Sequence, residues 1–353
     1  MKIPFDPKSH PSWNSALLRA CRRESTSFTP VWLLRQAGRY MREYREMREK
    51  VSLLELCRTP DLVAQVTTHA AERLGVDAAI LFSDLLLVAE PLGFQLEFTP
   101  GEGPALSPTL DTAADVDRVR TVEPGALSYV FDGARATRER LPDHLPLIGF
   151  AGAPFTLASY LIEGGPTRSF EKTKRFLYAD GGAWRALMAK LVPALIDLLN
   201  GQIRHGCSVV QIFDSWVGCL SPHDYRRYVK PYTAAVIAGL VPYVPVIHFG
   251  TGTSALLHDM REAGGDVIGL DWRVDLDEAW GRIGYDRPVM GNLDPVVLFA
   301  SEDILREQTR RILQRAAGRP GHIFNLGHGI LPDTPVDSVS RLVQLVHEMS
   351  RRP

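Results

Sequence analysis

The sequence predicts an α/β fold, a single (β/α)8 TIM-type barrel with an N-terminal extension, and two observations indicate it. Eight short runs rich in Val, Ile and Leu recur along the 353 residues, and each ends in polar residues or glycine. Continuous apolar character is typical of strands buried on both faces, as in a parallel sheet. Amphipathic segments separate many of the runs. The runs are residues 30–36, 77–84, 145–154, 207–215, 243–250, 266–272, 287–294 and 321–329.

Three of the intervening segments have the pattern of helices. Residues 61–75 repeat apolar side chains near the 3.6-residue period, and Gly75 is a suitable helix stop. Residues 186–206 and 302–318 are predicted to be helical as well. Alternating strands and helices favour a barrel over a doubly wound sheet with a cap domain, although some crossovers are short.

We expect one domain over residues 1–353, because no long linker divides the chain. Residues 1–28 precede the first predicted strand and are predicted to form an extension that packs on the barrel or on a partner.

Composition narrows the possible partners. The chain has 40 Lys and Arg against 41 Asp and Glu, so it lacks the basic excess that indicates nucleic-acid binding. Its four cysteines form no CxxC pair and show no metal spacing with histidine, which favours reduced thiols in the cytoplasm. The start of the chain lacks the apolar run of a signal peptide, and no uninterrupted apolar stretch approaches membrane-spanning length. We therefore expect a cytoplasmic protein without nucleic-acid or membrane partners.

The predicted barrel places its chemistry at the carboxyl ends of the strands. Polar residues or glycine stand at this end of every run, and we expect them to face one another across a single mouth. They are Arg35, Gln36, Ser83, Asp84, Gly152, Asp214, Ser215, His248, Asp271, Asn292, Asp294, Asn325 and His328.

The segment "RQAGR" after the first run has the composition of an anion-binding loop. Arg35 and Arg39 flank Gly38, which we expect to let the backbone turn. Guanidinium groups bind carboxylates bidentately, and the start of the following helix adds backbone N–H donors. The arginines from Arg42 onward alternate with glutamates and are better explained as an ion-paired, solvated helix face.

Four further residues are candidates for chemistry. Asp84 lies in an apolar stretch, so it needs either a structural arginine partner or a cationic or donor-rich ligand. Tyr160, in a glycine-rich segment, could equally be a core or surface residue. Ser215 and His328 could simply satisfy local hydrogen bonds, but glycines on both sides of His328 favour a functional loop.

One motif suggests a different function. Residues "HFGTGTSA" follow a predicted strand, and Asp271 comes about twenty residues later, as in a dinucleotide-binding fingerprint. The motif falls in the fifth unit instead of opening the fold, so it is a weak signal. A barrel helix could also start in this way.

Several long blocks, in the same order, resemble the uroporphyrinogen decarboxylase family. The resemblance runs from about Pro30 to Val336. It is carried by "PVWLLRQAGRYMREYR", "ILFSDLLLVAEPLG", "GFAGAPFTLASYLIEGG", "QIFDSWVG", "GLDWR", "GNLDP" and "NLGHGILPDTPVD".

The resemblance implies a single barrel, commonly a homodimer, in the cytoplasm. It implies an enzyme of haem and tetrapyrrole (porphyrin) biosynthesis, a lyase that removes carbon dioxide from the four acetate side chains of uroporphyrinogen III and yields coproporphyrinogen III. It also implies that neither a metal nor an organic cofactor is needed.

The same resemblance assigns roles to residues of the site. The loop binds substrate carboxylates, Asp84 lies under the centre of the macrocycle, and Tyr160, Ser215 and His328 contact carboxylates or assist proton steps. Asp84, Arg35 and Tyr160 are the catalytic candidates. The proton donor stays open among Arg35, which is a poor acid, a substrate carboxyl, and water relayed by Tyr160 or His328. The loop residues are Arg35, Gln36, Ala37, Gly38 and Arg39.

Two other functions are compatible with parts of the pattern. Zinc-dependent methyltransferases that act on corrinoid or thiol substrates resemble this family but carry a His-x-Cys pair near the fifth strand. Here Gly250 stands where the thiolate belongs, and no cysteine follows Cys219. A non-catalytic tetrapyrrole-binding protein would keep the arginines but would not need Asp84.

Overall fold

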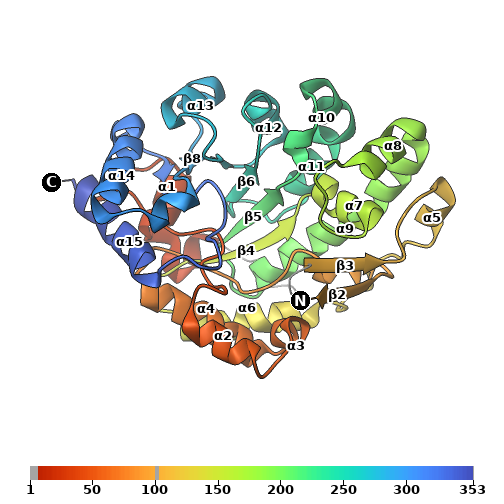
Figure 1. Cartoon of the computed structure of the whole chain (residues 1–353), viewed down its shortest axis with the longest axis horizontal. Coiled ribbons are helices and arrows are strands. Elements are labelled where there is room, and N and C mark those ends of the chain that lie inside the picture. The colour runs from red at the N-terminus through yellow and green to blue at the C-terminus, as the bar shows by residue number, and fades with distance from the viewer. Residues whose placement is uncertain (1–6, 100–102, 353) are drawn as a thin grey trace.

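A curled, parallel sheet of seven strands forms the centre of the protein, and helices surround it (Figure 1). The computed structural model describes residues 7–99 and 103–352. The strands of this sheet are β1 (Ala79–Ile80), β4 (Leu147–Gly152), β5 (Val209–Asp214), β6 (Val246–Gly250), β7 (Val267–Gly269), β8 (Val289–Met290) and β9 (His322–Ile323). They pair in the order β1-β4-β5-β6-β7-β8-β9, so each strand lies beside the next one along the chain.

Seven of the eight predicted runs thus form strands, but residues 30–36 do not form a regular one. Val31 makes a single parallel bridge to Phe324, and its carbonyl oxygen accepts a hydrogen bond from the N–H of Asp77 at 2.8 Å. Side-chain oxygens, instead of strand carbonyls, accept two further backbone N–H groups of this segment. The N–H of Val31 donates to Oδ2 of Asp77 at 2.7 Å, and the N–H of Leu34 donates to Oδ1 of Asn325 at 3.0 Å. The segment lies between β9 and β1 without completing an eight-stranded ladder.

The surrounding helices agree with the predicted periodicity. Residues 61–75, 186–206 and 302–318 fall largely in α4, α9 and α14, and Gly75 ends α4 in the left-handed conformation with φ +68°. The helices are α1 (Ala16–Cys21), α2 (Arg42–Arg48), α3 (Leu53–Arg58), α4 (Pro60–Leu74), α5 (Ala113–Asp117), α6 (Ser128–Arg140), α7 (Pro154–Glu163), α8 (Glu171–Ala179), α9 (Gly181–Arg204), α10 (Pro222–Tyr228), α11 (Lys230–Ala238), α12 (Leu257–Ala263), α13 (Leu276–Ile283), α14 (Glu302–Ala316) and α15 (Val336–Ser350).

Strand alternation divides the sheet side chains between two cores. One set, including Ile148, Val209 and Ile247, packs with Leu17 and Leu18 of α1 in a cluster of its own. The other set belongs to the larger core that includes the helices. The sheet therefore holds two apolar layers apart, as expected for strands buried on both faces.

The described part of the N-terminal extension lies at the amino end of the strands. The hydroxyl of Ser12 donates to that of Ser208 at 3.2 Å, just before β5. The Arg23 guanidinium donates to the carbonyl of Asp286 at 3.3 Å, before β8. This segment therefore packs at the end of the sheet opposite the loops that follow the strands.

An antiparallel hairpin, absent from the predicted elements, lies between β1 and β4. Its strands are β2 (Gln95–Thr99) and β3 (Gly103–Ser107), and Leu96 pairs with Leu106 across it. Both leucines are buried, so the hairpin covers part of the core.

Among the described residues, only α9 is long and apolar enough to cross a membrane by length and composition. Within its most apolar window, 61% is buried inside the protein. Leu187, Leu191 and Leu195 of α9 belong to the larger core, so the helix has the surroundings of a core helix.

Candidate functional site at the carboxyl end of the sheet

The backbone turns at both ends of the RQAGR loop, at Arg35 and from Gly38 to Met41. Arg35 has φ +59°, a left-handed conformation that is uncommon for a residue with a side chain, whereas Gly38 is not in this region. Gly38 lies in a bend, and its carbonyl accepts a hydrogen bond from the N–H of Met41 at 3.0 Å, so the predicted turn at Gly38 is confirmed although it does not use the left-handed conformation. A side chain at Gly329 would collide with Cγ and Cδ of Arg35, so the Arg35 side chain runs directly over this glycine.

The two guanidinium groups of the loop are available to bind an anion. Arg35 and Arg39 are exposed, and within residues 7–99 and 103–352 neither forms an ion pair. Other groups hold the backbone in place. Arg45 donates to the carbonyls of Arg39 and Tyr40 at 2.8 and 3.1 Å, and the Tyr40 hydroxyl donates to the carbonyl of Gln36. The arrangement presents two guanidinium groups on a fixed loop.

The other members of the loop are less exposed. The Gln36 side chain is buried, with Oε1 accepting from the N–H of Leu33 at 3.4 Å. It therefore lies within its own loop, and its Nε2 has no hydrogen-bond partner there. Ala37 and Gly38 are half-buried, so their contribution to binding would come from the backbone.

Asp84 lies just beyond β1 with one oxygen engaged. Its Oδ1 accepts from the N–H of Leu86 at 2.9 Å, and no ion pair involves Asp84 in the described part of the chain. Burial raises the pKa of the carboxyl, while the Leu86 amide and the Arg35 charge oppose this shift. Arg35 is thus close enough to act on Asp84 electrostatically but is not bonded to it. The alternative of a structural ion pair with an arginine is not found among the described residues.

Tyr160 comes from α7 and shares this environment. Its ring stacks on Trp216 at a centroid distance of 3.8 Å. Burial, reinforced by the charge of Asp84 and opposed by that of Arg35, raises the pKa of Tyr160 to about 12. The phenol is therefore protonated at neutral pH. Arg35, Asp84 and Tyr160, which are 125 positions apart in the chain at their extremes, lie within electrostatic reach of one another.

His328 lies in the loop after β9 and is half-buried. Burial lowers the pKa of its imidazole, and the charges of Arg35 and Arg273 lower it further. The ring is therefore neutral at pH 7, able to donate one hydrogen bond and accept another. Trp272 packs edge-on against it, with ring centroids 6.0 Å apart.

Ser215 connects to this group through its neighbour. It follows β5 and is half-buried, and its carbonyl accepts a hydrogen bond from the Thr251 hydroxyl. The next residue is Trp216, the stacking partner of Tyr160. The structure therefore brings Arg35, Asp84, Tyr160 and His328 together directly and Ser215 through this stack.

Two strand-end residues that we expected at the mouth, Asp214 and His248, are instead buried between the sheet and the surrounding helices. Asp214 alternates with the inward residues of β5, and its Oδ1 accepts from the Thr156 hydroxyl of α7 at 3.2 Å. Nε2 of His248 lies 3.8 Å from Oδ2 of Asp214, and both side chains are fully buried. The expectation that all strand-end groups face one mouth is wrong for this pair, because strand alternation turns them toward the helices.

Asp271 and Asn292 hold loops in place. Asp271 accepts from the N–H of Gly252 at 2.5 Å, so the acid and the glycine loop of the dinucleotide-like motif bind each other. Since α12 does not begin until Leu257, that loop also does not open a helix as the fingerprint requires. Asn292 donates to the Asp271 carbonyl at 2.8 Å. These contacts count against dinucleotide binding.

Sequence reasoning missed two residues of this site. Trp216 and Arg273 both lie in blocks that carry the family resemblance, yet neither was singled out. A single tryptophan or arginine beside a strand end has no distinctive pattern. Only the stacking of Trp216 on Tyr160 and the electrostatic effect of Arg273 on His328 distinguish them.

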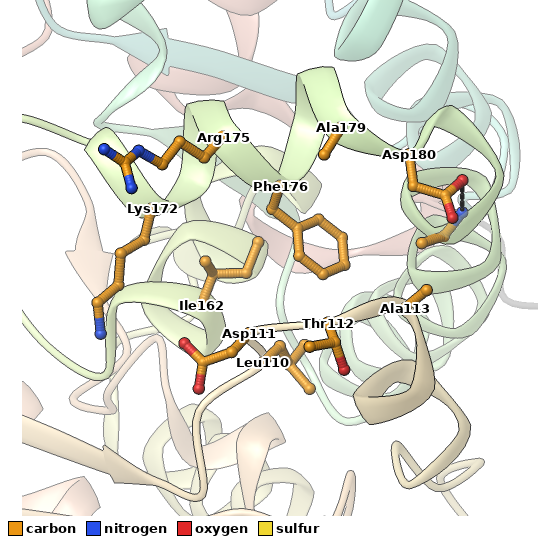
Figure 2. A pocket seen from close by; sticks show the side chains of 11 residues that line it. Leu110, Asp111, Thr112, Ala113, Ile162, Lys172, Arg175, Phe176, Ala179 and Asp180 are labelled. Carbon is orange, nitrogen blue, oxygen red and sulfur yellow. Dashed lines mark hydrogen bonds between the residues drawn. The ribbon is translucent and has the colours of Figure 1, made fainter.

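Figure 2 shows a surface hollow of 380 Å³ that is lined by residues of α5, α7, α8 and α9. The charges around it serve the fold. Arg175 pairs with Glu171 at 2.7 Å, and Asp180 accepts the first N–H groups of α9. None of the predicted site residues lines it, so we place the candidate site at the strand ends. Its lining is Leu110, Asp111, Thr112, Ala113, Ile162, Lys172, Arg175, Phe176, Ala179, Asp180 and Ala183.

A family model and the curated relatives of this chain point to the same family. The family model described as uroporphyrinogen decarboxylase (URO-D) matches residues 12–349. A uroporphyrinogen decarboxylase from Sorangium cellulosum is 53% identical over 336 residues, covering 95% of this chain and 96% of that protein. One from Koribacter versatilis is 51% identical over 339 residues, covering 96% and 97%.

A solved structure shares the fold at low identity. A methyltransferase from Methanosarcina mazei superposes with a TM-score of 0.79 at 20% identity, covering 94% of this chain and 97% of that one. This likeness concerns the fold. In the part of the chain that the structure describes, no group of three or more His, Cys, Asp or Glu side chains could hold a metal ion. The family model and the curated relatives support the decarboxylase more than the methyltransferase alternative.

Proposed function

The chain belongs to the uroporphyrinogen decarboxylase family, and from this premise we propose that it removes carbon dioxide from the four acetate side chains of uroporphyrinogen III to give coproporphyrinogen III. The observation that carries the proposal is the group around Asp84. A partly buried carboxylate with one oxygen free of hydrogen bonds among the described residues lies close to Arg35 and Tyr160.

The substrate itself can supply the electron sink for this reaction. Protonation of a pyrrole ring carbon gives an iminium-like cation, and the electron pair of the bond to the departing carboxylate then flows into the ring. Carbon dioxide leaves, the resulting exocyclic methylene takes up a proton to become a methyl group, and the ring carbon gives up its added proton to restore the aromatic pyrrole. A cation formed on the substrate removes the need for a cofactor that stabilises carbanions.

Asp84 is suited to stabilise that cation. Its free oxygen can accept hydrogen bonds from pyrrole N–H groups, and its negative charge opposes the positive charge that develops on the ring. Such preorganised electrostatic stabilisation is commonly the largest catalytic contribution, and loss of one group costs about 3–4 kcal/mol in comparable sites.

Arg35 and Arg39 are suited to hold the carboxylates of the substrate. Both guanidinium groups are exposed on a fixed loop and unpaired among the described residues. A guanidinium binds a carboxylate through two parallel hydrogen bonds, which orients as well as attracts it. Backbone groups of Gln36, Ala37 and Gly38 can complete the loop surface.

Tyr160 and His328 are better suited to relay protons than to release them. Tyr160 has a pKa raised to about 12, and the imidazole of His328 has a lowered pKa, so both are neutral at pH 7. Each can donate one hydrogen bond and accept another. We propose that the ring proton comes from a substrate carboxyl or water bound by Tyr160, Ser215 or His328, since Arg35 is a poor acid.

We further propose that residues 1–353 form one domain whose sheet closes into a barrel through residues 30–36. Val31 bridges to Phe324 on one side, and its carbonyl accepts the N–H of Asp77 on the other, which supports this closure. The family resemblance supports a homodimer that acts in the cytoplasm without a metal or an organic cofactor. Sedimentation of the purified protein checks the dimer.

Turnover of the purified protein tests the function. Anaerobically prepared uroporphyrinogen III is incubated with protein that has been treated with a chelator, and the oxidised products are separated by chromatography. We expect intermediates with seven, six and five carboxyl groups before the four-carboxyl product, because the four acetate carboxyls are lost one at a time. An absolute need for added metal, nicotinamide or thiol would contradict the proposal.

A further inference from the structure

The loop after β7 carries an arginine that is held in place on one side and exposed on the other. Oδ2 of Asp271 accepts a hydrogen bond from Nη1 of Arg273 at 2.9 Å, and Oδ1 accepts from the Arg273 N–H at 3.0 Å. The Asp271 side chain is 2% exposed, whereas that of Arg273 is 52% exposed. The acid therefore anchors the guanidinium from the protein side.

An aromatic face fixes the plane of the same guanidinium. Its central carbon lies 3.8 Å from the centroid of the Trp272 ring. Stacking and a single anchored nitrogen leave little freedom to this side chain, so less entropy is lost when it binds an anion. Among the described residues, no hydrogen bond reaches Nε or Nη2 of Arg273, so these donors remain available.

Asp271 does not fully neutralise this arginine. Its carboxylate also accepts the N–H groups of Gly252 and of Arg273 itself. Four lone-pair positions are thus shared among several donors. An anchored arginine of this kind can still attract a second carboxylate on its exposed edge.

The loop also lies beside the candidate site. A side chain at Gly327 would collide with the backbone of Asp271 and Trp272, so the loops after β7 and β9 touch. Trp272 packs edge-on against His328, with ring centroids 6.0 Å apart. Arg273 acts electrostatically on the same imidazole as Arg35 does. The two arginines therefore approach His328 from different loops.

We propose that Arg273 binds a carboxylate side chain of the tetrapyrrole substrate beside His328, as a third arginine in addition to Arg35 and Arg39. This inference rests on the proposed function. The substrate carries carboxylates all around its ring, and one short loop cannot reach both sides of it. Arg273 follows β7, which β8 and β9 separate from residues 30–36, so it can serve a different side chain of the macrocycle.

The test compares Arg273→Gln with Arg282→Gln. Arg282 is a matched control because its side chain is 51% exposed and pairs with Glu278 on α13. In Arg273→Gln we expect the KM for uroporphyrinogen to rise on the order of tenfold, with kcat within about twofold of the parent, because a charge-assisted hydrogen bond to substrate is lost. The dependence of KM on salt concentration should also weaken. Arg282→Gln should match the parent in both.

Arg273→Lys keeps the positive charge but loses the two parallel N–H donors of the guanidinium. Its KM should therefore lie between that of the parent and that of Arg273→Gln. If Arg273→Gln does not fold, Arg273→Lys alone decides the question through its smaller rise in KM above that of the parent. An unchanged KM, or a loss of kcat at unchanged KM, overturns the role of Arg273.

Direct binding separates this inference from the proposed function. Quenching of protein fluorescence by uroporphyrin, the oxidised octacarboxylate, measures affinity without turnover. If the parent protein binds uroporphyrin but decarboxylates nothing, the proposed function fails, and weaker binding by Arg273→Gln still supports the carboxylate site. If the parent is active, and Arg273→Gln and Arg273→Lys bind uroporphyrin as tightly as the parent does, the inference about Arg273 fails while the proposed function stands.

Discussion

At the scale of single residues, Asp84 carries an energetic cost that no contact among the described residues explains. Burial raises the pKa of its carboxyl, which means that the charged form is less stable in the folded protein than in water. Its one hydrogen bond, to the N–H of Leu86, would also form with a neutral asparagine. A carboxylate kept in such a place is expected to act on a ligand.

Asp84→Asn should therefore increase stability at neutral pH. A raised folded-state pKa means that the folded protein binds more protons than the unfolded chain above the ordinary aspartate pKa of about 3.9. The parent thus loses stability as pH rises through this window toward the raised pKa. We expect the urea midpoint of Asp84→Asn to exceed that of the parent at pH 7, and the difference to shrink as pH falls. A variant less stable than the parent at every pH would show that Asp84 is a structural anion.

Residue patterns predicted much of this site but not all of it. Asp84 and His328 stand out in the sequence because an acid among apolar residues and a histidine between glycines are unusual. Arg273 does not stand out, because its role depends on a stack with Trp272 and on contact between the loops after β7 and β9. The left-handed backbone at Arg35 was not predicted, since composition favours glycine at such positions.

At the scale of secondary-structure elements, α7 and the end of β5 act as one unit. The Thr156 hydroxyl of α7 donates to Oδ1 of Asp214 at 3.2 Å and accepts the N–H of Trp216 at 3.4 Å. One helical turn later, Tyr160 stacks on Trp216. The helix and the strand end therefore position the phenol together.

Thr156→Val should weaken both stability and turnover. The replacement keeps the shape but leaves the buried Asp214 carboxylate without this donor, which costs about 1–3 kcal/mol of unfolding free energy. We expect kcat to fall several-fold, because Trp216 and Tyr160 lose their common anchor. Thr309→Val is the control, since that buried hydroxyl on α14 donates only to the carbonyl of Leu305. Equal kcat values for the two variants would show that the Thr156 contact is structural only.

The positions of the strands could be predicted from the apolar runs, but whether each run forms a regular hydrogen-bonded strand could not. The seven strands of the sheet fall within predicted runs, whereas residues 30–36 make only one bridge. The reason is local: the side chains of Asp77 and Asn325 accept the N–H groups of Val31 and Leu34. The β2–β3 hairpin was missed because its strands, QLEFT and GPALS, lack the continuous apolar run by which the other strands were recognised.

At the scale of the whole molecule, the N-terminal helix and the candidate site lie at opposite ends of the sheet. Helix α1 packs at the amino end, where Leu17 and Leu18 join the cluster that includes Ile247 and Met290. The candidate site lies on the loops that follow the strands. This division is typical of barrels, in which one end serves stability and the other carries function.

Leu17→Ala should separate the two ends experimentally. The side chain is fully buried, so truncation should cost about 2–5 kcal/mol of unfolding free energy. Below the unfolding transition we expect kcat and KM to stay within about twofold of the parent, because the change lies at the opposite end of the sheet from Asp84. Urea unfolding and turnover on the same samples check this. A large change in KM with little loss of stability would contradict the division.

The most direct test of the central claim is the single-turnover rate of Asp84→Asn with uroporphyrinogen at saturating protein. If the Asp84 charge stabilises a cationic ring, the variant should bind substrate nearly as well as the parent but react slower by a factor on the order of a hundred to a thousand. A rate equal to that of the parent would contradict the claim and leave Asp84 with no part in the chemistry.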